Sequence, residues 1–366
     1  MGEQPRIDHV RDGRARRVEL LSKIGAARKS FVISYLTSTR PGAIGRSMQR
    51  RDVEIIEPHV RAAKAQNAAS LDLILLTEGG SSVAPWDLVA MVREYFPDKS
   101  FRVIVPSVAY SAGATICLGA DDIVMGPGSV LGPVDAQVDS GGELGSFSAS
   151  AFQGFLDAMK HLGVPLWRRR SRGMDWLTTK LNALQAGEAF RLWHEDRRII
   201  NNLLNSRRNR LSRRANERIL SFLLYQVADH AQPIRRKEAR QNGISFITDI
   251  EKTNVEGLVT DLFREYENVM LLNVPLARRA ELLRRQPLPG DEDDKDVRGV
   301  PVSSTPIAIV ESAHDCNPAY IAYALRHWNE VPKVDEDVAP PKPDKRVEHH
   351  FAANSSLKWD SVGKRW

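Results

Sequence analysis

Two short segments of the chain contain residues that together could carry out acyl transfer. A glycine pair, Gly79 and Gly80, follows a buried-strand pattern at residues 71–76, and Ser111 begins the helical pattern after the next strand. Glycine lets backbone N–H groups approach a carbonyl oxygen closely, so one of this pair and the N–H of Ala112 could form an oxyanion hole. Ser111 would then be the nucleophile, with the positive end of the helix dipole beside it.

Ser111 also has a purely structural interpretation. Serine is a preferred N-cap residue, and a serine before a helix, taken alone, is more often a cap than a nucleophile. The sequence pattern around it, described below, favours the catalytic role.

The elements that would position these residues alternate between strand and helix. This alternation predicts an α/β domain with mainly parallel strand pairing. Residues 103–120 carry no charge, but proline and glycine interrupt them, which favours a buried strand followed by a helix over a membrane span. The clearest strand patterns lie at residues 31–36, 71–76, 101–105 and 121–125, and the clearest helical patterns at residues 52–65 and 83–96.

Three segments, LDLILLTEGG, VIVPSVAYSAGATICLGADDIVMGPGSVLGPVDAQV and DHAQPIRRKEARQNGI, resemble the Clp protease and signal-peptide peptidase fold group, particularly its serine dehydrogenase proteinase family. The resemblance covers about residues 31–270. It implies a ClpP/crotonase-like fold of repeated β-β-α units. It also implies Ser111 as nucleophile, with oxyanion donors at Gly79 or Gly80 and at Ala112. One departure is Glu78, which stands where this fold group usually has proline.

The general base of this site is left open by the sequence. Proteases that resemble Clp carry a histidine shortly beyond the serine, whereas no histidine lies between Ser111 and His161. A Ser-Lys dyad is therefore the better hypothesis. Lys180 is favoured because its surroundings, KLNALQAGEAFR, resemble some family members, and Lys160 is the alternative. The resemblance implies that His230 lines the site, while a helix cap or a backbone contact is its structural alternative.

The composition is that of an ordinary globular protein. Of the 366 residues, 42% are hydrophobic and 27% are charged, which excludes a wholly disordered, collagenous or coiled-coil chain. Cys117 and Cys316 form neither a disulfide framework nor a metal-binding pair, and the first residues lack the apolar core of a signal peptide. We therefore expect a cytoplasmic protein.

The predicted organisation has three parts. Residues 1–29 are a polar arm, residues 30–273 the peptidase domain, and residues 274–366 a linker and flexible C-terminal tail. Much of the net charge of +6 comes from arginines within a predicted helical block at residues 176–225. A solvated helix face is the simplest interpretation of these arginine-rich helices, and contact with nucleic acid or a membrane is the alternative.

No cofactor and no metal are expected. His349 and His350 have no acidic or cysteine partners at ligand spacing, and TEGGSS lacks the lysine of a phosphate-binding loop. ATP would therefore have to be bound by a separate partner, such as an ATP-dependent unfoldase. The resemblance implies a homo-oligomer that acts on a polypeptide substrate.

Three classes of function are consistent with these residues. The first is a serine peptidase that cleaves polypeptides through an acyl-enzyme on Ser111. The second is a crotonase-type acyl-CoA enzyme, because that fold uses similar glycine N–H donors for enolates; acyl-CoA binding would distinguish it. The third is a catalytically inactive scaffold that binds nucleic acid or a partner protein, which salt-sensitive binding without peptidase activity would reveal.

Overall fold

The computed structural model describes residues 13–41, 47–134, 136–139, 146–151, 154, 161, 183–226, 232–274, 306–322 and 356–359. The chain divides into two compact units. The larger unit comprises residues 25–32 and 47–256, and the smaller unit comprises residues 1–24, 33–46 and 257–366. All the residues predicted for catalysis belong to the larger unit.

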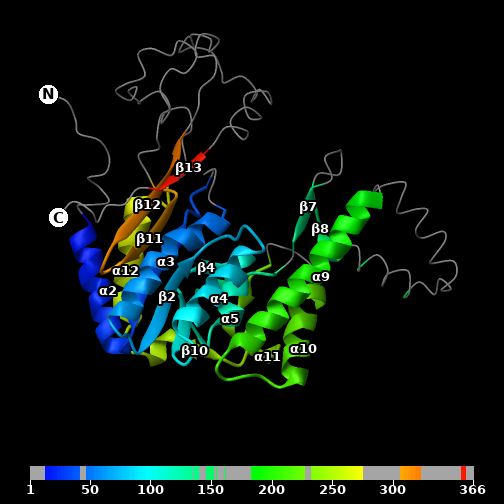
Figure 1. Cartoon of the computed structure of the whole chain (residues 1–366), viewed down its shortest axis with the longest axis horizontal. Coiled ribbons are helices and arrows are strands. Elements are labelled where there is room, and N and C mark those ends of the chain that lie inside the picture. Colours follow the sequence, from blue (N-terminus) through cyan, green and yellow to red (C-terminus); the bar gives the residue numbers. More distant parts are fainter. Residues whose placement is uncertain are drawn as a thin grey trace, which may run out of the picture. The chain divides into compact units, whose positions relative to one another are not determined.

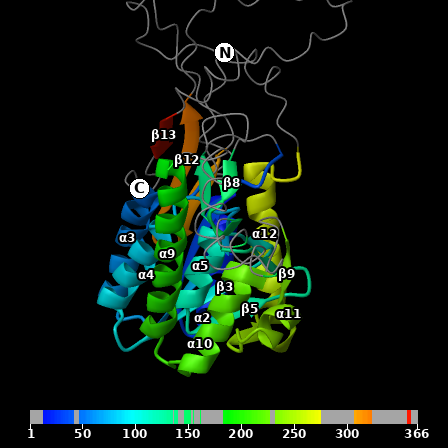
Figure 2. The same ribbon diagram turned by 90° about the vertical axis from the view of Figure 1, so that its right-hand side faces the viewer.

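The larger unit is built on parallel strands in the order β10-β5-β3-β2. Figure 1 labels β2 and β10, and Figure 2 labels β3 and β5. All seven residues of β2 are buried, as expected for a parallel strand that is covered on both faces. The predicted α/β architecture with parallel pairing of these strands is therefore confirmed. The strands are β2 (Ser70–Leu76), β3 (Ser100–Val105), β5 (Asp122–Met125) and β10 (Ile247–Asp249).

Helices cover this sheet and supply one wall of the site. Helix α5 is buried along its whole length and packs against both α4 and α9, which run beside it in Figure 2. Over residues 183–225, the described part of the predicted helical block, the structure has α9, α10 and a π-helical turn at Phe222–Gln226, where the sequence suggested one long block. The α-helices described in this unit are α3 (Arg50–Ala65), α4 (Ala84–Tyr95), α5 (Ala112–Gly119), α9 (Ala183–Ser206), α10 (Arg213–Ser221) and α11 (Arg236–Gln241).

Residues 103–120 form the end of β3, the short strand β4 (Val108–Ala109) and α5. The prediction of a strand followed by a helix is therefore confirmed for this uncharged segment. Among the residues that the structure describes, no helix is long and apolar enough to cross a membrane.

Two small sheets complete the larger unit. The first has the order β4-β6-β9, with β6 at Val130–Leu131 and β9 at Ile234–Arg235. The second is a hairpin of β7 (Gln137–Asp139) and β8 (Ser146–Ser148). The parallel pairing of β4 with β6 fixes the segment that leads into Ser111.

The smaller unit contains an antiparallel arrangement in the order β1-β11-β12-β13. The sequence predicted a polar arm with one helix and a flexible tail here. The structure has helix α2 in the arm, where it buries Leu20, Leu21 and Ile24, and strand β11 in the tail, which is buried along its length. A short apolar run inside polar, proline-rich surroundings accounts for the strand in the tail. The described elements of this unit are α12 (Glu256–Met270), β11 (Ala308–Ser312), β12 (Cys316–Ala322) and β13 (Ser356–Trp359). Residues 14–24 of α2 (Arg14–Arg28) and residues 33–37 of β1 (Phe31–Thr37) also belong to it.

Candidate active site

Ser111 lies at the turn between β4 and α5 in an uncommon backbone conformation. Its φ is 49° and its ψ is −113°. A positive φ costs a residue other than glycine about 1–3 kcal/mol, and such strain is concentrated at functional sites. Ser111 occupies the N-cap position of α5, but its side chain makes no capping hydrogen bond. The interpretation of Ser111 as a side-chain helix cap is therefore wrong.

Backbone hydrogen bonds from the end of β2 hold this turn. The Thr77 carbonyl accepts from the Tyr110 N–H at 3.0 Å, and the Thr77 N–H donates to the Val108 carbonyl at 3.1 Å. The Gly113 N–H donates to the Tyr110 carbonyl at 2.8 Å, which closes the turn around Ser111. A Cβ at Gly113 would lie 2.5 Å from the Thr77 Cγ2 atom, so the turn requires glycine there.

The glycine pair packs directly against this turn. Gly79 has a φ of 107° and Gly80 a φ of 152°. A Cβ added to Gly79 would lie 2.7 Å from the Ser111 Cβ and 3.2 Å from the Ser111 Oγ. On another side of the loop, the Met48 N–H donates to the Gly79 carbonyl at 2.8 Å, and the Met48 carbonyl accepts from the Ser81 N–H at 2.9 Å. The structure thus brings together the two motifs that the sequence placed after separate strands.

Hydrogen bonding distinguishes the two glycine N–H groups. The Gly79 N–H donates to the Thr77 Oγ1 atom at 3.1 Å. Across a planar trans peptide, the carbonyl of one residue and the N–H of the next point in opposite directions. Because the Gly79 carbonyl accepts from the Met48 N–H, the Gly80 N–H points away from Met48. This geometry favours Gly80 over Gly79 as an oxyanion donor.

Replacing Gly80 by alanine is expected to lower the free energy of unfolding by about 2–5 kcal/mol. The added Cβ would lie 2.3 Å from the Met48 carbonyl oxygen and 2.4 Å from its nitrogen, at a φ of 152°. Urea denaturation of the variant and the wild type measures the change. The matched control is Gly187→Ala within α9, where a Cβ meets nothing within 4 Å and alanine favours the helix. Equal stabilities of the two variants would contradict this close contact.

A pocket opens beside Ser111 in the larger unit. It is small, with a cavity volume of about 20 Å³, and it is partly open to solvent. Most of its exposed wall is apolar. Its lining residues are Ser82, Ser111, Ala112, Thr115 and Val134 together with Asp196, Ile199 and Ile200 of α9.

Asp196 is a candidate site residue that sequence reasoning missed. Its side chain is buried, and its Oδ2 atom accepts a hydrogen bond from the Ala136 N–H at 2.9 Å. This bond ties α9 to the segment that leads into β7. The signal in the sequence is spacing, because Asp196 precedes Ile199 and Ile200 by one helical turn and so places a carboxylate on the apolar face of α9.

Comparison with known families identifies the segment that contains the glycine pair and Ser111. Residues 4–146 match the family profile described as ClpP-like SDH-type serine proteinase. This segment belongs to the ClpP-like SDH-type serine proteinase family. The family resemblance predicted from the sequence is thereby confirmed for residues 31–146, whereas the match also includes most of the predicted arm and does not reach the segment DHAQPIRRKEARQNGI. The matched segment ends before α9, so the α9 wall of the pocket lies outside it.

Two curated relatives of the chain are uncharacterized proteins of Methanocaldococcus jannaschii. One is 34% identical over 127 residues, which cover 33% of this chain and 43% of the relative. The other is 38% identical over 68 residues, which cover 19% of this chain and 23% of the relative. The chain thus spans less than half the length of the curated relatives that it matches.

Two solved structures resemble parts of the chain. A serine-to-alanine mutant of the 1510-N membrane-bound stomatin-specific protease covers 60% of this chain and 80% of its own, with 13% identity and a TM-score of 0.37. ClpP1 from Listeria monocytogenes covers 63% of this chain and 96% of its own, with 14% identity and a TM-score of 0.34.

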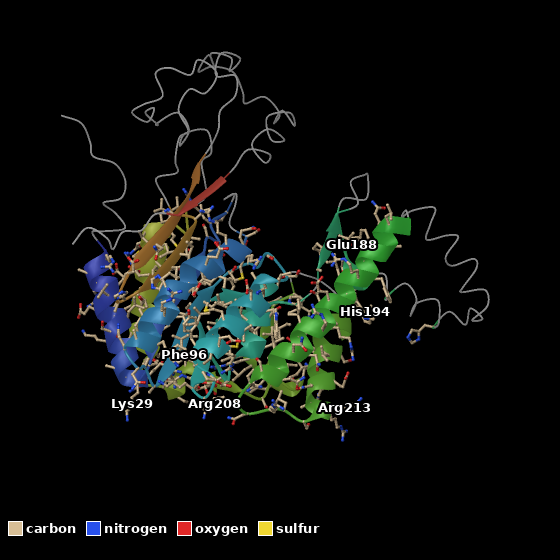
Figure 3. All side chains as sticks on the ribbon, in the orientation of Figure 1. Lys29, Phe96, Glu188, His194, Arg208 and Arg213 are labelled. Carbon is tan, nitrogen blue, oxygen red and sulfur yellow. The ribbon has the colours of Figure 1, made fainter. Side chains whose placement is uncertain are left out.

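The remaining residues predicted for the serine proteinase site are Lys180, Lys160 and His230. All three lie outside the residues that the structure describes, so their roles stay predictions. His194 on α9 is exposed and packs edge to face against Phe190, with ring centroids 4.3 Å apart (Figure 3). Within the described ranges, no group of three His, Cys, Asp or Glu side chains could hold a metal ion.

Proposed function

We propose that this protein is a serine peptidase that cleaves polypeptides through an acyl-enzyme on Ser111. The observation that carries the proposal is the placement of Ser111 at a strained turn, against the Gly79 backbone and on the wall of a pocket, without a capping bond. The membership of residues 4–146 in a serine proteinase family supports the same chemistry.

In the proposed reaction, the Ser111 Oγ attacks the carbonyl carbon of a peptide bond and gives its proton to a general base. The N–H groups of Gly80 and Ala112 stabilise the negative charge that develops on the carbonyl oxygen, aided by the positive end of the α5 dipole. The base returns the proton to the departing amine, and water then hydrolyses the ester bond to Ser111. The apolar wall beside Ser111, including Val134 and Ile199, contacts the substrate next to the bond that is cleaved.

We assign the general base to Lys180. A lysine can accept the serine proton only in its neutral form, so this role requires surroundings that lower its pKa. Arg197 and Arg198 cannot replace it, because an arginine stays protonated. Arg197 also pairs with Glu217 at 2.8 Å.

Substituting Lys180 by alanine is expected to lower kcat by about 10²–10⁴-fold, which is the usual effect of removing a general base. Lys160→Ala removes the same charge and is expected to retain most of the activity. Hydrolysis of casein by the purified variants measures both effects. Full activity of Lys180→Ala, or an equal loss in both variants, would reject the assignment.

Casein hydrolysis by the wild type and by Ser111→Ala tests the proposed function itself. Circular dichroism of both proteins verifies that they are folded. Activity in the wild type alone would support a serine peptidase, whereas equal activity in the two proteins would overturn the proposal. If neither protein hydrolysed casein, peptidase activity would be rejected under these conditions, and measurable acyl-CoA binding would then favour the crotonase-type chemistry.

A further inference from the structure

The loop between α9 and α10 and the exposed side of α10 carry a cluster of arginines. We call this the arginine surface; its members are all exposed, and they are Arg208, Arg210, Arg213, Arg214 and Arg218. Figure 3 shows Arg208 and Arg213 at the outer edge of the larger unit. No lysine occurs between residues 207 and 218, so every cationic group of this segment is a guanidinium.

Two acidic residues near these arginines, Glu217 and Asp121, have other partners. Glu217 pairs with Arg197 at 2.8 Å, and Asp121 pairs with Arg93 at 3.0 Å. In the part of the chain that the structure describes, no ion pair joins the arginine surface to an acidic side chain. Its positive charge is therefore available to an external anion.

Buried contacts hold the backbone of this surface in place. Arg207 begins the loop and is 3% exposed, and its guanidinium carbon lies 3.1 Å from the centre of the Phe246 ring. Arg207 also donates to the Asp121 carbonyl at 3.1 Å, and the Arg208 N–H donates to the Asp121 carboxylate at 2.8 Å. The side chain of Ser212 caps α10. A ligand that binds here thus meets a preorganised backbone, which lowers the entropic cost of binding.

The composition of the arginine surface selects among anionic ligands. Insertion into a bilayer needs exposed apolar side chains, and proteins bind single-stranded nucleic acid largely by stacking bases on aromatic side chains. This surface offers neither, because Ile219 and Leu220 of α10 are buried. Guanidinium groups bind phosphate in a bidentate manner. The exposed large hydrophobic residues of the described chain lie elsewhere, at Val83, Leu184, Phe190 and Val274.

We propose that the arginine surface binds the phosphate backbone of double-stranded nucleic acid without sequence preference. Arg214 and Arg218 are four residues apart on α10, a rise of about 6 Å, so they lie on the same face of the helix and can contact different phosphates of one duplex. Five phosphate contacts give a slope of about −4.5 for log K against log salt concentration, and hence about a 500-fold loss of affinity between 50 and 200 mM salt. This binding is independent of the proposed peptidase activity.

Fluorescence anisotropy with a short labelled DNA duplex of arbitrary sequence tests this proposal on the full chain. The triple variant Arg210→Gln, Arg213→Gln, Arg214→Gln should bind on the order of 100-fold more weakly near 100 mM salt, and its salt slope should be shallower by about 2.7. Basic residues in the first turn of a helix oppose its dipole, so losing Arg213 and Arg214 should not lower Tm. A thermal melt checks that the variant is folded.

The matched control removes three exposed arginines from α3 and the first half of α9, as Arg50→Gln, Arg61→Gln and Arg191→Gln. It loses the same net charge and should retain the affinity and salt slope of the wild type. Equal weakening of the control, no duplex binding by the wild type, or preferential binding to phosphatidylserine vesicles would overturn the proposal. Ser111→Ala should bind the duplex like the wild type. Duplex binding can therefore be tested whether or not the proposed peptidase activity is found.

Discussion

Replacing Ser111 by glycine is expected to abolish the proposed peptidase activity while making the protein more stable than the Ser111→Ala variant. Both substitutions remove the attacking oxygen, so activity should fall by at least about 10³-fold. They differ in the backbone, because alanine keeps the strain of a φ of 49° and a ψ of −113°. Glycine relieves most of that strain, but its greater conformational freedom in the unfolded chain offsets part of the effect. The free energy of unfolding of Ser111→Gly should therefore exceed that of Ser111→Ala by about 1 kcal/mol.

Urea denaturation of the two Ser111 variants measures this difference, and casein hydrolysis measures their activity. Both variants lack the Ser111 hydroxyl, so its loss affects them equally. The difference between their free energies of unfolding therefore measures the backbone strain. A glycine variant less stable than the alanine variant would show that the turn is not strained. Hydrolysis retained by either variant would exclude Ser111 as the nucleophile.

Replacing Glu311 by alanine is expected to lower the free energy of unfolding of the smaller unit by about 3–5 kcal/mol, because it leaves a buried guanidinium without its counter-charge. Arg17 donates to the Glu311 carboxylate from Nε at 2.7 Å and from Nη2 at 3.1 Å. The Tyr266 hydroxyl donates to the same carboxylate at 2.8 Å. All three side chains are fully buried. Burial, with a further contribution from the Glu311 carboxylate, raises the pKa of Tyr266 well above its ordinary value.

A matched control for this prediction is Glu19→Ala on α2. Glu19 is exposed and pairs with Lys23 and Arg16, so its loss should leave the urea midpoint nearly unchanged. The double variant Arg17→Met, Glu311→Leu should recover much of the lost stability, because apolar residues of similar volume replace a buried ion pair well. A Glu311→Ala variant as stable as the control would show that the buried Arg17 guanidinium does not need the Glu311 carboxylate.

The sequence predicted the parallel strands and the position of Ser111 because both depend on local patterns. The run LDLILL is apolar apart from Asp72 and is soon followed by a glycine pair, which is typical of a parallel strand covered on both faces, and the structure buries all of it. The small residues around Ser111 predicted close packing, and Gly113 against Thr77 shows why they are needed. The sequence left the choice between Gly79 and Gly80 open, since it depends on a Thr77 side-chain bond.

The spacing of Asp196 places it on the apolar face of α9, but its position at the Ser111 pocket depends on long-range packing. It meets the Ser111 pocket only because α9 packs against α5, two helices far apart in the chain. The smaller unit shows a related limit. Arg17 and Glu311 lie in segments whose polar composition suggested an arm and a tail, and their burial depends on a pairing that spans almost the whole sequence.

The contact of Met48 with the glycine loop limits which sequence changes this part of the protein can accept. Both hydrogen bonds are made by the main chain, so they do not depend on which side chain stands at position 48. They do depend on register, because a residue gained or lost between positions 47 and 50 would present the wrong N–H and carbonyl to Gly79 and Ser81. At this position the loop tolerates a change of residue type, within the limits of packing, far better than a change of chain length.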